Sequence, residues 1–251
     1  MTALPKLSTP ERAALLLSLL ALGVLLEVAA FWRRIGRARR FAAVASPFER
    51  RLSAKGAMVL ILGDSTGVGV GATRPEESVA GLFAADYPEA DIVNVAASGA
   101  RVTDAITQVR RCSEAGLCFD LALLHVGGVD VVADTPLRRL ADDCDILMRE
   151  LGRLAARTAW LGPPDLGLAP LFPRPYAWVM ASRSRAASKV FSAAAARHDV
   201  LFIDFSAPAH VAYFKKRRRK HFAVDGFHPN SASYKYGYAA VRQMLGLHQP
   251  G

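Results

Sequence analysis

Five short apolar segments recur along the chain from residue 58 onwards, each separated from the next by a stretch of helix length. Their apolar residues are consecutive rather than alternating, which is typical of strands buried on both faces of a parallel sheet. The segments predict strands at 58–62, 91–97, 119–126, 158–162 and 199–205. The stretches between them predict helices at 77–86, 102–111, 136–157 and 176–198, and a last helix runs from 231 to about 245.

Strand and helix therefore alternate through the whole region, and this order predicts a fold of the α/β class. We expect a three-layer α/β/α architecture in which helices cover both faces of a doubly wound, five-stranded parallel sheet. Ligands of such sheets bind in the crevice at the carboxyl ends of the strands. The turns that follow the strands are therefore the places to search for chemistry.

A longer apolar run lies near the N-terminus, where residues 13–32 read AALLLSLLALGVLLEVAAFW and include one charge, at Glu27. A helix of about 20 residues is about 30 Å long, which is the thickness of the hydrocarbon core of a bilayer. Apolar residues surround this helix, which favours a transmembrane helix over an amphipathic one lying on the membrane or on the domain. A cleaved signal peptide would begin with basic residues, whereas here they follow the run.

These patterns divide the chain into an N-terminal tail (1–12), a transmembrane helix (13–32), a basic linker (33–56) and the α/β domain (57–247). The positive-inside rule places the RRIGRARR flank of the helix in the cytoplasm. We therefore expect a single-pass protein of the inner or plasma membrane with a cytoplasmic domain. A periplasmic or extracellular domain is the alternative.

The formal net charge of +10 comes from two basic clusters, without which the chain has 21 basic and 22 acidic residues. We expect the second cluster, Lys215 to Lys220, to interact with anionic lipid headgroups. Neither cluster interleaves aromatic residues in a nucleic-acid-binding motif, which argues against nucleic acid as a partner. The first cluster consists of Arg33, Arg34, Arg37, Arg39 and Arg40.

The cysteines Cys112, Cys118 and Cys144 are odd in number, so they cannot all pair within the chain. We expect three reduced thiols, and a bridge between Cys112 and Cys118 in an oxidising compartment is the alternative. No cluster of His and Cys has the spacing of metal ligands, so neither a metal nor another cofactor is expected.

A candidate nucleophile follows the first predicted strand, in ILGDSTGVGVGAT, where Ser65 lies at the turn into a glycine-rich segment. A serine needs a base within hydrogen-bond reach, and that base needs a third group to orient it. In VDGFHPN, near the C-terminus, Asp225 precedes His228 by three residues. An aspartate in that position can hold one imidazole nitrogen while the other nitrogen faces the serine. The sequence thus predicts a catalytic triad of Ser65, Asp225 and His228.

Four separated motifs follow one another in a fixed order: Gly63-Asp64-Ser65, Asn94 and Gly99 in NVAASGA, HVGGVD at 125–130, and Asp225 with His228. In that order they resemble the motif blocks of the SGNH (GDSL-type) hydrolases, and the resemblance covers about 58–247. It implies a flavodoxin-like SGNH fold and an ester hydrolase of the esterase, lipase or thioesterase type that acts on small-molecule or lipid esters. It also implies that the backbone amides of Ser65 and Gly99 form the oxyanion hole.

One position departs from that family pattern. The third block is usually Gly-x-Asn-Asp, and its asparagine donates to the developing oxyanion, whereas this chain has Val129 there. Loss of one oxyanion-hole donor costs about a hundred- to a thousandfold in rate. The outcomes are a slower esterase, a compensating donor elsewhere, or an SGNH-like binding protein with little or no turnover. We expect Gly127, Val129 and Pro163 to border the substrate.

Three polar residues near these motifs have ordinary structural explanations. Asp64 and Asp130 lie next to tight turns, where carboxylates commonly accept hydrogen bonds from backbone amides. His125 shares a strand face with Gly127, and we expect a half-buried histidine with satisfied hydrogen bonds, with a polar role at the site as the alternative.

A nucleotide-binding module is a further alternative, because Gly67, Gly69 and Gly71 follow the first strand. In a dinucleotide-binding fingerprint the first glycine ends the strand, and an acidic residue closes the second strand. Here the residues GDST lie between the end of the first strand and Gly67. The second strand ends in Ala97-Ser98-Gly99, which includes no acidic residue. The sequence therefore disfavours nucleotide binding.

We predict that Val129→Asn raises the turnover of an activated ester by about tenfold or more, because it restores a side-chain donor for the oxyanion. The measurement is kcat, with Val129→Ala as a control that shortens the side chain without adding a donor. An unchanged or lower rate for the asparagine variant would show that the site is built around valine.

Overall fold

The sheet is parallel throughout, and its five strands have the order β2-β1-β3-β4-β5. The computed structural model describes residues 8–52 and 56–247. Gly63, the last residue of β1, pairs with His125, the last residue of β3, so these strands end together. The strands are β1 (Met58–Gly63), β2 (Asp91–Asn94), β3 (Phe119–His125), β4 (Ala155–Leu161) and β5 (Leu201–Ile203).

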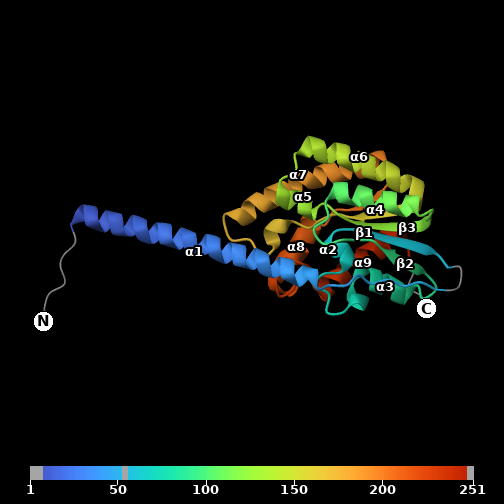
Figure 1. Cartoon of the computed structure of the whole chain (residues 1–251), viewed down its shortest axis with the longest axis horizontal. Coiled ribbons are helices and arrows are strands. Elements are labelled where there is room, and N and C mark those ends of the chain that lie inside the picture. The colour runs from blue at the N-terminus through green and yellow to red at the C-terminus, as the bar shows by residue number, and fades with distance from the viewer. Residues whose placement is uncertain (1–7, 53–55, 248–251) are drawn as a thin grey trace.

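Helices cover both faces of the sheet (Figure 1). One face packs against α4 (Val102–Glu114), α6 (Leu137–Leu154) and α7 (Tyr176–Arg197). The other face packs against α3 (Val79–Asp86), α8 (Pro208–Lys216) and α9 (Ser231–Leu245). The three-layer α/β fold predicted from the sequence is confirmed.

Each strand contributes to both cores, because successive side chains of a strand point to opposite faces. In β1, Leu60 and Leu62 belong to the core under α4, α6 and α7, whereas Val59 and Ile61 belong to the other core. All four side chains are at most 1% exposed. Burial of each such side chain stabilises the fold by about 1.5–3 kcal/mol. Burial on both faces explains why the strand sequences are apolar at consecutive positions.

Short helical segments follow several strands and were not predicted from the sequence. Each is too short to show a helical period of apolar residues. They are α2 (Ser65–Val68), α5 (Gly128–Ala133), η1 (Pro75–Glu77), η2 (Leu166–Leu168) and η3 (Arg218–Lys220).

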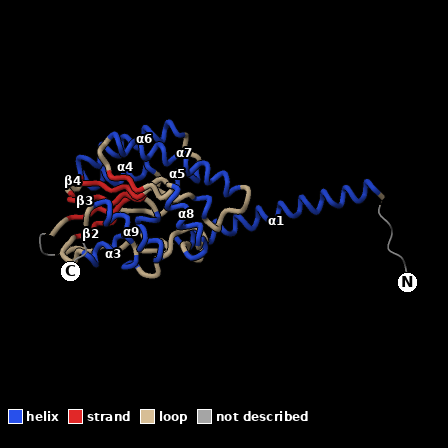
Figure 2. Tube along the Cα trace, turned by 180° about the vertical axis from the view of Figure 1, so that it is seen from behind, coloured by secondary structure: helices blue, strands red, loops and turns tan. Residues whose placement is uncertain are grey.

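Helix α1 (Thr9–Ala43) has 35 residues, and its N-terminal half stands clear of the domain (Figures 1 and 2). Among the described residues it is the one helix that is long and apolar enough to cross a membrane. The large apolar side chains between Leu15 and Val28 are 47–70% exposed. Of the predicted N-terminal tail (1–12), residues 1–7 lie outside the described part of the chain, and the helix includes the rest from Thr9.

The helix continues past residue 32 to Ala43, so the first part of the expected linker at 33–56 is helical. Basic residues hid the helical period, but Phe31, Ile35 and Ala38 recur at that period and pack on the domain. Ala38 is only 6% exposed. After the helix, the chain follows the edge of the sheet, where Arg50 forms a β-bridge with Ile92.

The three cysteines are free, as expected from the sequence. Cys112 and Cys144 are buried, and Cys118 is exposed. The boundary between α6 and β4 also differs from the prediction, because the helix ends at Leu154 and the strand begins at Ala155.

Candidate active site

The candidate nucleophile lies directly beyond the carboxyl end of β1. Gly63 has a φ of 117°, and a Cβ at this position would lie 1.8 Å from the carbonyl oxygen of His125. Only glycine therefore lets β1 approach β3 so closely at this end. The chain then turns into α2 with Ser65 as its first residue, and the Ser65 side chain is 8% exposed.

Hydrogen bonds on both sides fix this end of β1. The Gln108 side chain, from α4, accepts from the Gly63 amide at 2.8 Å and donates to the Gly63 carbonyl at 3.0 Å. The Asp64 carboxylate accepts from the amide of Thr66 at 2.8 Å and from its hydroxyl at 2.7 Å. The turn that presents Ser65 is thus held by a buried amide side chain and a capping carboxylate.

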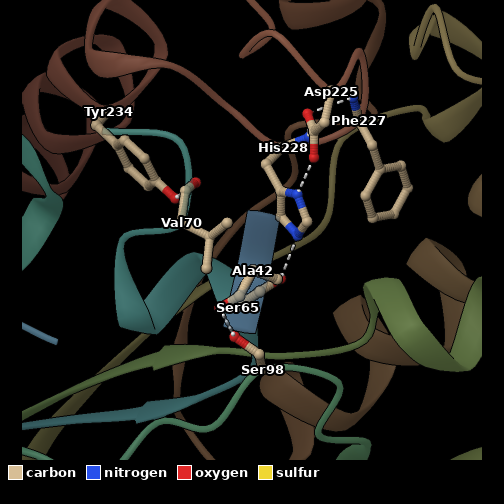
Figure 3. Close-up of polar contacts among 8 residues, drawn as sticks. All are labelled: Ala42, Ser65, Val70, Ser98, Asp225, Phe227, His228 and Tyr234. Atoms are coloured by element: carbon tan, nitrogen blue, oxygen red, sulfur yellow. Dashed lines mark hydrogen bonds and ion pairs between the residues drawn. The ribbon is translucent and has the colours of Figure 1, made fainter. Parts of the chain in front are cut away.

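The candidate base reaches Ser65 from the turn before α9 (Figure 3). His228 Nε2 lies 3.0 Å from Ser65 Oγ, and His228 Nδ1 lies 2.5 Å from Asp225 Oδ2. Asp225 Oδ1 accepts from the backbone amides of Phe227 and His228, at 3.0 and 3.1 Å. Asp225 therefore shapes the turn and orients the imidazole with the same carboxylate. The three residues predicted from the sequence are brought together in one chain of hydrogen bonds.

The environment of Asp225 favours its charged form. Burial raises its pKa, but the hydrogen bonds from the His228 side chain and the neighbouring amides outweigh burial and lower the pKa below its ordinary value. An ionised Asp225 keeps the proton on Nδ1 of His228, so Nε2 is free to accept the Ser65 proton.

Two further buried groups lie beside the triad. Burial raises the pKa of Asp64 to about 6, although its hydrogen bonds to Thr66 act in the opposite direction. Burial lowers the pKa of His125 to about 4, so this histidine is neutral near pH 7. His125 Nε2 is buried and has no hydrogen-bond partner among the described residues.

The loop after β2 carries the residues of the second sequence motif. Asn94 is buried, and its side-chain amide donates to the carbonyls of Gly67 at 3.0 Å and Phe48 at 3.3 Å. Gly99 lies in the exposed part of the same loop, next to Ser98. Asn94 thus fastens the loop to the turn that contains Ser65.

The third motif forms the first turn of α5 and carries the valine that departs from the family pattern. Asp130 accepts from the amide of Val102 at 3.0 Å, so it makes the kind of backbone contact that we predicted for Asp64 and Asp130. Val129 faces the same cavity as Ser65. Its side chain offers no hydrogen-bond donor to that space.

A cavity of about 120 Å³ opens beside Ser65 and His228. Val129 and Pro163, which we expected near the substrate, line it, and Gly128 lines it in place of Gly127. Gly127 packs instead on the ring of Phe191, which lies 2.6 Å from the position of an added Cβ. Apolar side chains form most of the remaining wall: Val79, Leu161, Leu166, Leu168, Phe205, Phe214, Phe222 and Phe227. They come from segments far apart in the sequence, so no local pattern identified them.

The end of α1 also reaches the site, which the sequence did not predict. The Phe41 ring lies 6.5 Å from the imidazole of His228, centroid to centroid. The Ser98 hydroxyl donates to the carbonyl of Ala42 at 3.4 Å (Figure 3). Across residues 8–52 and 56–247, no group of three or more His, Cys, Asp or Glu side chains has the arrangement of a metal site.

Comparisons with known proteins identify relatives by family and by fold. The family model described as GDSL-like Lipase/Acylhydrolase family matches residues 61–236. No curated protein matches the chain.

Three solved structures of similar fold are distant from this chain in sequence. LAE5, an α/β hydrolase enzyme from the metagenome of Lake Arreo in Spain, is 20% identical with a TM-score of 0.60, over 77% of this chain and 96% of that chain. A catalytic mutant of Axe2, an acetylxylan esterase from Geobacillus stearothermophilus, is 21% identical with a TM-score of 0.61, over 78% and 96%. Phospholipase A1 from Streptomyces albidoflavus NA297 is 20% identical with a TM-score of 0.56, over 75% and 99%.

We predict that Asp64→Asn stabilises the protein near pH 7 and not near pH 4. Asparagine keeps the hydrogen bonds to Thr66 and removes the cost of a buried charge. Because the pKa of Asp64 is raised from 3.8 to about 6 in the folded protein, the unfolded chain ionises first as the pH rises, and stability is lost across that interval. The gain above about pH 6 should approach, at most, about 3 kcal/mol.

The measurement is denaturant unfolding of both proteins in detergent at the two pH values. A difference of the same size at both would contradict the assignment of a buried, proton-linked carboxyl to Asp64.

Proposed function

The chain belongs to the GDSL-like lipase/acylhydrolase family and is an ester hydrolase, and from this premise we propose that it is a membrane-anchored serine hydrolase that forms an acyl-enzyme. The observation that supports the mechanism is the chain of hydrogen bonds from Asp225 through His228 to Ser65. A serine, a base and an orienting carboxylate in this order make up the apparatus of nucleophilic acyl transfer.

In the first step, Ser65 Oγ attacks the ester carbonyl carbon while His228 Nε2 takes the hydroxyl proton. Ionised Asp225 stabilises the resulting imidazolium. The tetrahedral intermediate collapses as the bond to the alcohol oxygen breaks, and His228 returns the proton to that oxygen. In the second step, water loses a proton to His228 and attacks the acyl-enzyme, which releases the carboxylic acid and restores Ser65.

The oxyanion hole of the proposed enzyme consists of the backbone amides of Ser65 and Gly99. The buried side chain of Asn94 supports this arrangement because it ties the loop of Gly99 to the turn of Ser65. Val129 adds no third donor, which lowers the expected turnover. That same residue favours a second candidate, a protein of this family that binds esters with little or no turnover.

The cavity supports a substrate with an apolar acyl group. Its wall beside Ser65 is built mainly from aliphatic and aromatic side chains, so an apolar group that enters it leaves water. Phospholipase A1 and acetylxylan esterase, both of similar fold, are described as acting on esters of very different alcohols. The fold therefore accommodates many alcohols, and the wall of the cavity is the better guide to the acyl group.

Helix α1 supports the membrane anchor. Its exposed apolar section is followed by five arginines between Arg33 and Arg40, which by the positive-inside rule favour a cytoplasmic domain. Lys215 to Lys220 form a second basic segment, and all of these side chains except the half-buried Arg218 are exposed. Anionic headgroups attract such residues by about 1 kcal/mol each near the surface.

We predict that Ser65→Ala lowers the hydrolysis of short p-nitrophenyl esters by about a thousandfold or more, because it removes the hydroxyl that is hydrogen-bonded to His228 Nε2. Labelling by a fluorophosphonate probe should disappear with it. Ser98→Ala, on the neighbouring loop, is the matched control and should retain labelling. Wild-type protein that hydrolyses no ester and takes no label, beside a control hydrolase that does, would favour the binding protein.

We predict that a membrane-impermeant maleimide labels Cys118 only after the cells are permeabilised, because the domain is cytoplasmic. Cys118 is exposed, and the other two cysteines are buried, so it reports the side of the membrane. Cys118→Ser is the control and should abolish labelling. Labelling of intact cells would place the domain outside the cytoplasm.

A further inference from the structure

We infer that α1 is a wall of the active-site entrance as well as an anchor, and that the enzyme takes its ester from the headgroup of an amphiphile held in the same bilayer. This inference rests on the proposed function and specifies its substrate class. It depends on three observations: the contacts of α1 at the site, the direction in which the site faces, and its height above the membrane.

The last turn of α1 contacts both sides of Ser65. The Phe41 ring lies against His228, the proposed base, and the Ala42 carbonyl accepts from Ser98, the neighbour of Gly99. Figure 3 shows the second of these contacts, between Ala42 in the last turn of α1 and Ser98. Among the described residues, the lining of the cavity includes none from α1, so the end of the helix borders the approach to the site rather than the cavity itself.

A row of aromatic rings holds α1 in this place. Phe31 contacts Phe172 at 6.4 Å and Tyr176 at 5.6 Å, measured between ring centroids. Phe172 contacts Phe227 at 5.8 Å, and Phe227 contacts His228 at 5.0 Å. The helix is thus packed against the turn that positions the base. A flexible tether would make none of these contacts.

The active-site edge of the sheet faces the free end of α1. In Figure 1, α2, α5 and α8, which follow β1, β3 and β5 in the chain, lie on the side from which α1 leaves the domain, and Figure 2 shows α5 and α8 on the same side. The basic segment Lys215–Lys220 comprises the last two residues of α8, Arg217 and η3. The Arg218 guanidinium donates to the carbonyls of Leu168 and Ala169, in the loop that lines the cavity. The basic surface therefore lies beside the entrance.

The continuous helix sets the height of the site. Trp32 ends the apolar run, and Phe41 lies nine residues later, so the entrance is about 14 Å beyond the hydrocarbon core along the helix axis. The headgroup layer extends about 5–8 Å from that core. The entrance therefore lies about 6–9 Å beyond the headgroup layer. An ester at the glycerol of an undisturbed phospholipid lies too deep, whereas an ester carried outward on a polar headgroup comes nearer to the height of Ser65.

The test uses the full chain reconstituted in phosphatidylcholine vesicles, with cholesteryl glucoside acylated by octanoate as the membrane-bound ester. Release of octanoate should be about a hundredfold faster when enzyme and ester share a vesicle than when they are in separate vesicles, because tethering raises the effective concentration. Methylumbelliferyl butyrate, dissolved in the same sample, reports the activity of Ser65 toward a water-borne ester.

Equal rates in the shared and separate arrangements would overturn the inference, as would hydrolysis of the phosphatidylcholine in preference to the glucoside ester. Hydrolysis of the butyrate alone would also overturn it while the proposed function stands. If neither ester is cleaved and a fluorophosphonate does not label Ser65, the proposed function itself fails.

A longer helix tests the height. Duplicating residues 31–37 adds about two turns, or about 10 Å, and the second copy keeps nearly the same face toward the domain. The rate on the glucoside ester in shared vesicles should fall about tenfold, because the anchor no longer matches the span, while butyrate hydrolysis is retained. An unchanged rate on the glucoside ester would contradict the inference.

Phe41 variants test the wall. Phe41→Ala should raise KM for the glucoside ester about fivefold more than KM for the butyrate. Phe41→Leu, which keeps a large apolar side chain, should return the ratio of the two KM values most of the way to that of the wild type. Phe48→Ala is the control, because Phe48 is half-buried against the other core and away from His228. If the Phe48 variant changes the KM ratio as much as the Phe41 variant does, Phe41 has no specific role.

Discussion

The pairing of β1 with β3 at Gly63 and His125 is the constraint on which the site depends. A side chain at Gly63 would collide with the His125 carbonyl, so the two strands can end together only because this residue is glycine. That end is closed further by the Gln108 side chain, which bonds the amide and the carbonyl of Gly63. The position of the end of β1 therefore determines the position of Ser65. The base, 163 residues away in the sequence, then needs only a short turn to meet it.

Burial disfavours the charged forms of Asp225, Asp64 and His125, and hydrogen bonds outweigh this effect only at Asp225. Asp225 remains ionised because three hydrogen bonds compensate for its lost hydration, whereas Asp64, with fewer partners, has its pKa raised toward neutrality. His125 is held neutral in the same region. Above about pH 6 both carboxylates therefore carry a charge, but only at Asp225 do hydrogen bonds lower the pKa below its ordinary value. The valine at 129 is the exception in this polar arrangement, because it leaves one side of the developing oxyanion without a donor.

The exposed apolar residues of α1 and its contacts at the active site belong to one continuous helix. The large apolar side chains of α1 between Leu15 and Val28 are exposed, whereas the last turn of the helix contacts the turn of His228 and the loop of Gly99. A rigid connection of this kind restricts both the orientation and the height of the site at a membrane. A flexible linker would restrict only the distance between the site and the membrane.

The sequence by itself determined the local elements, the fold class and the residues that meet at the site. Buried parallel strands must be apolar at consecutive positions, and amphipathic helices must show their period, so both are visible in any short window. Ser65, Asp225 and His228 were also visible, because each lies in a turn whose local residues set its geometry; their catalytic roles remain predictions.

Only the tertiary structure decided what depends on packing between distant segments. The arginines of residues 33–40 masked the stripe of Phe31, Ile35 and Ala38, because a local pattern does not reveal which neighbour will cover a helix face. Gly128 rather than Gly127 lines the cavity, because Gly127 packs against the ring of Phe191. The approach of Phe41 to His228 likewise joins segments with no common local signal. Such contacts follow from the relative positions of whole elements, which the order of residues within each element does not specify.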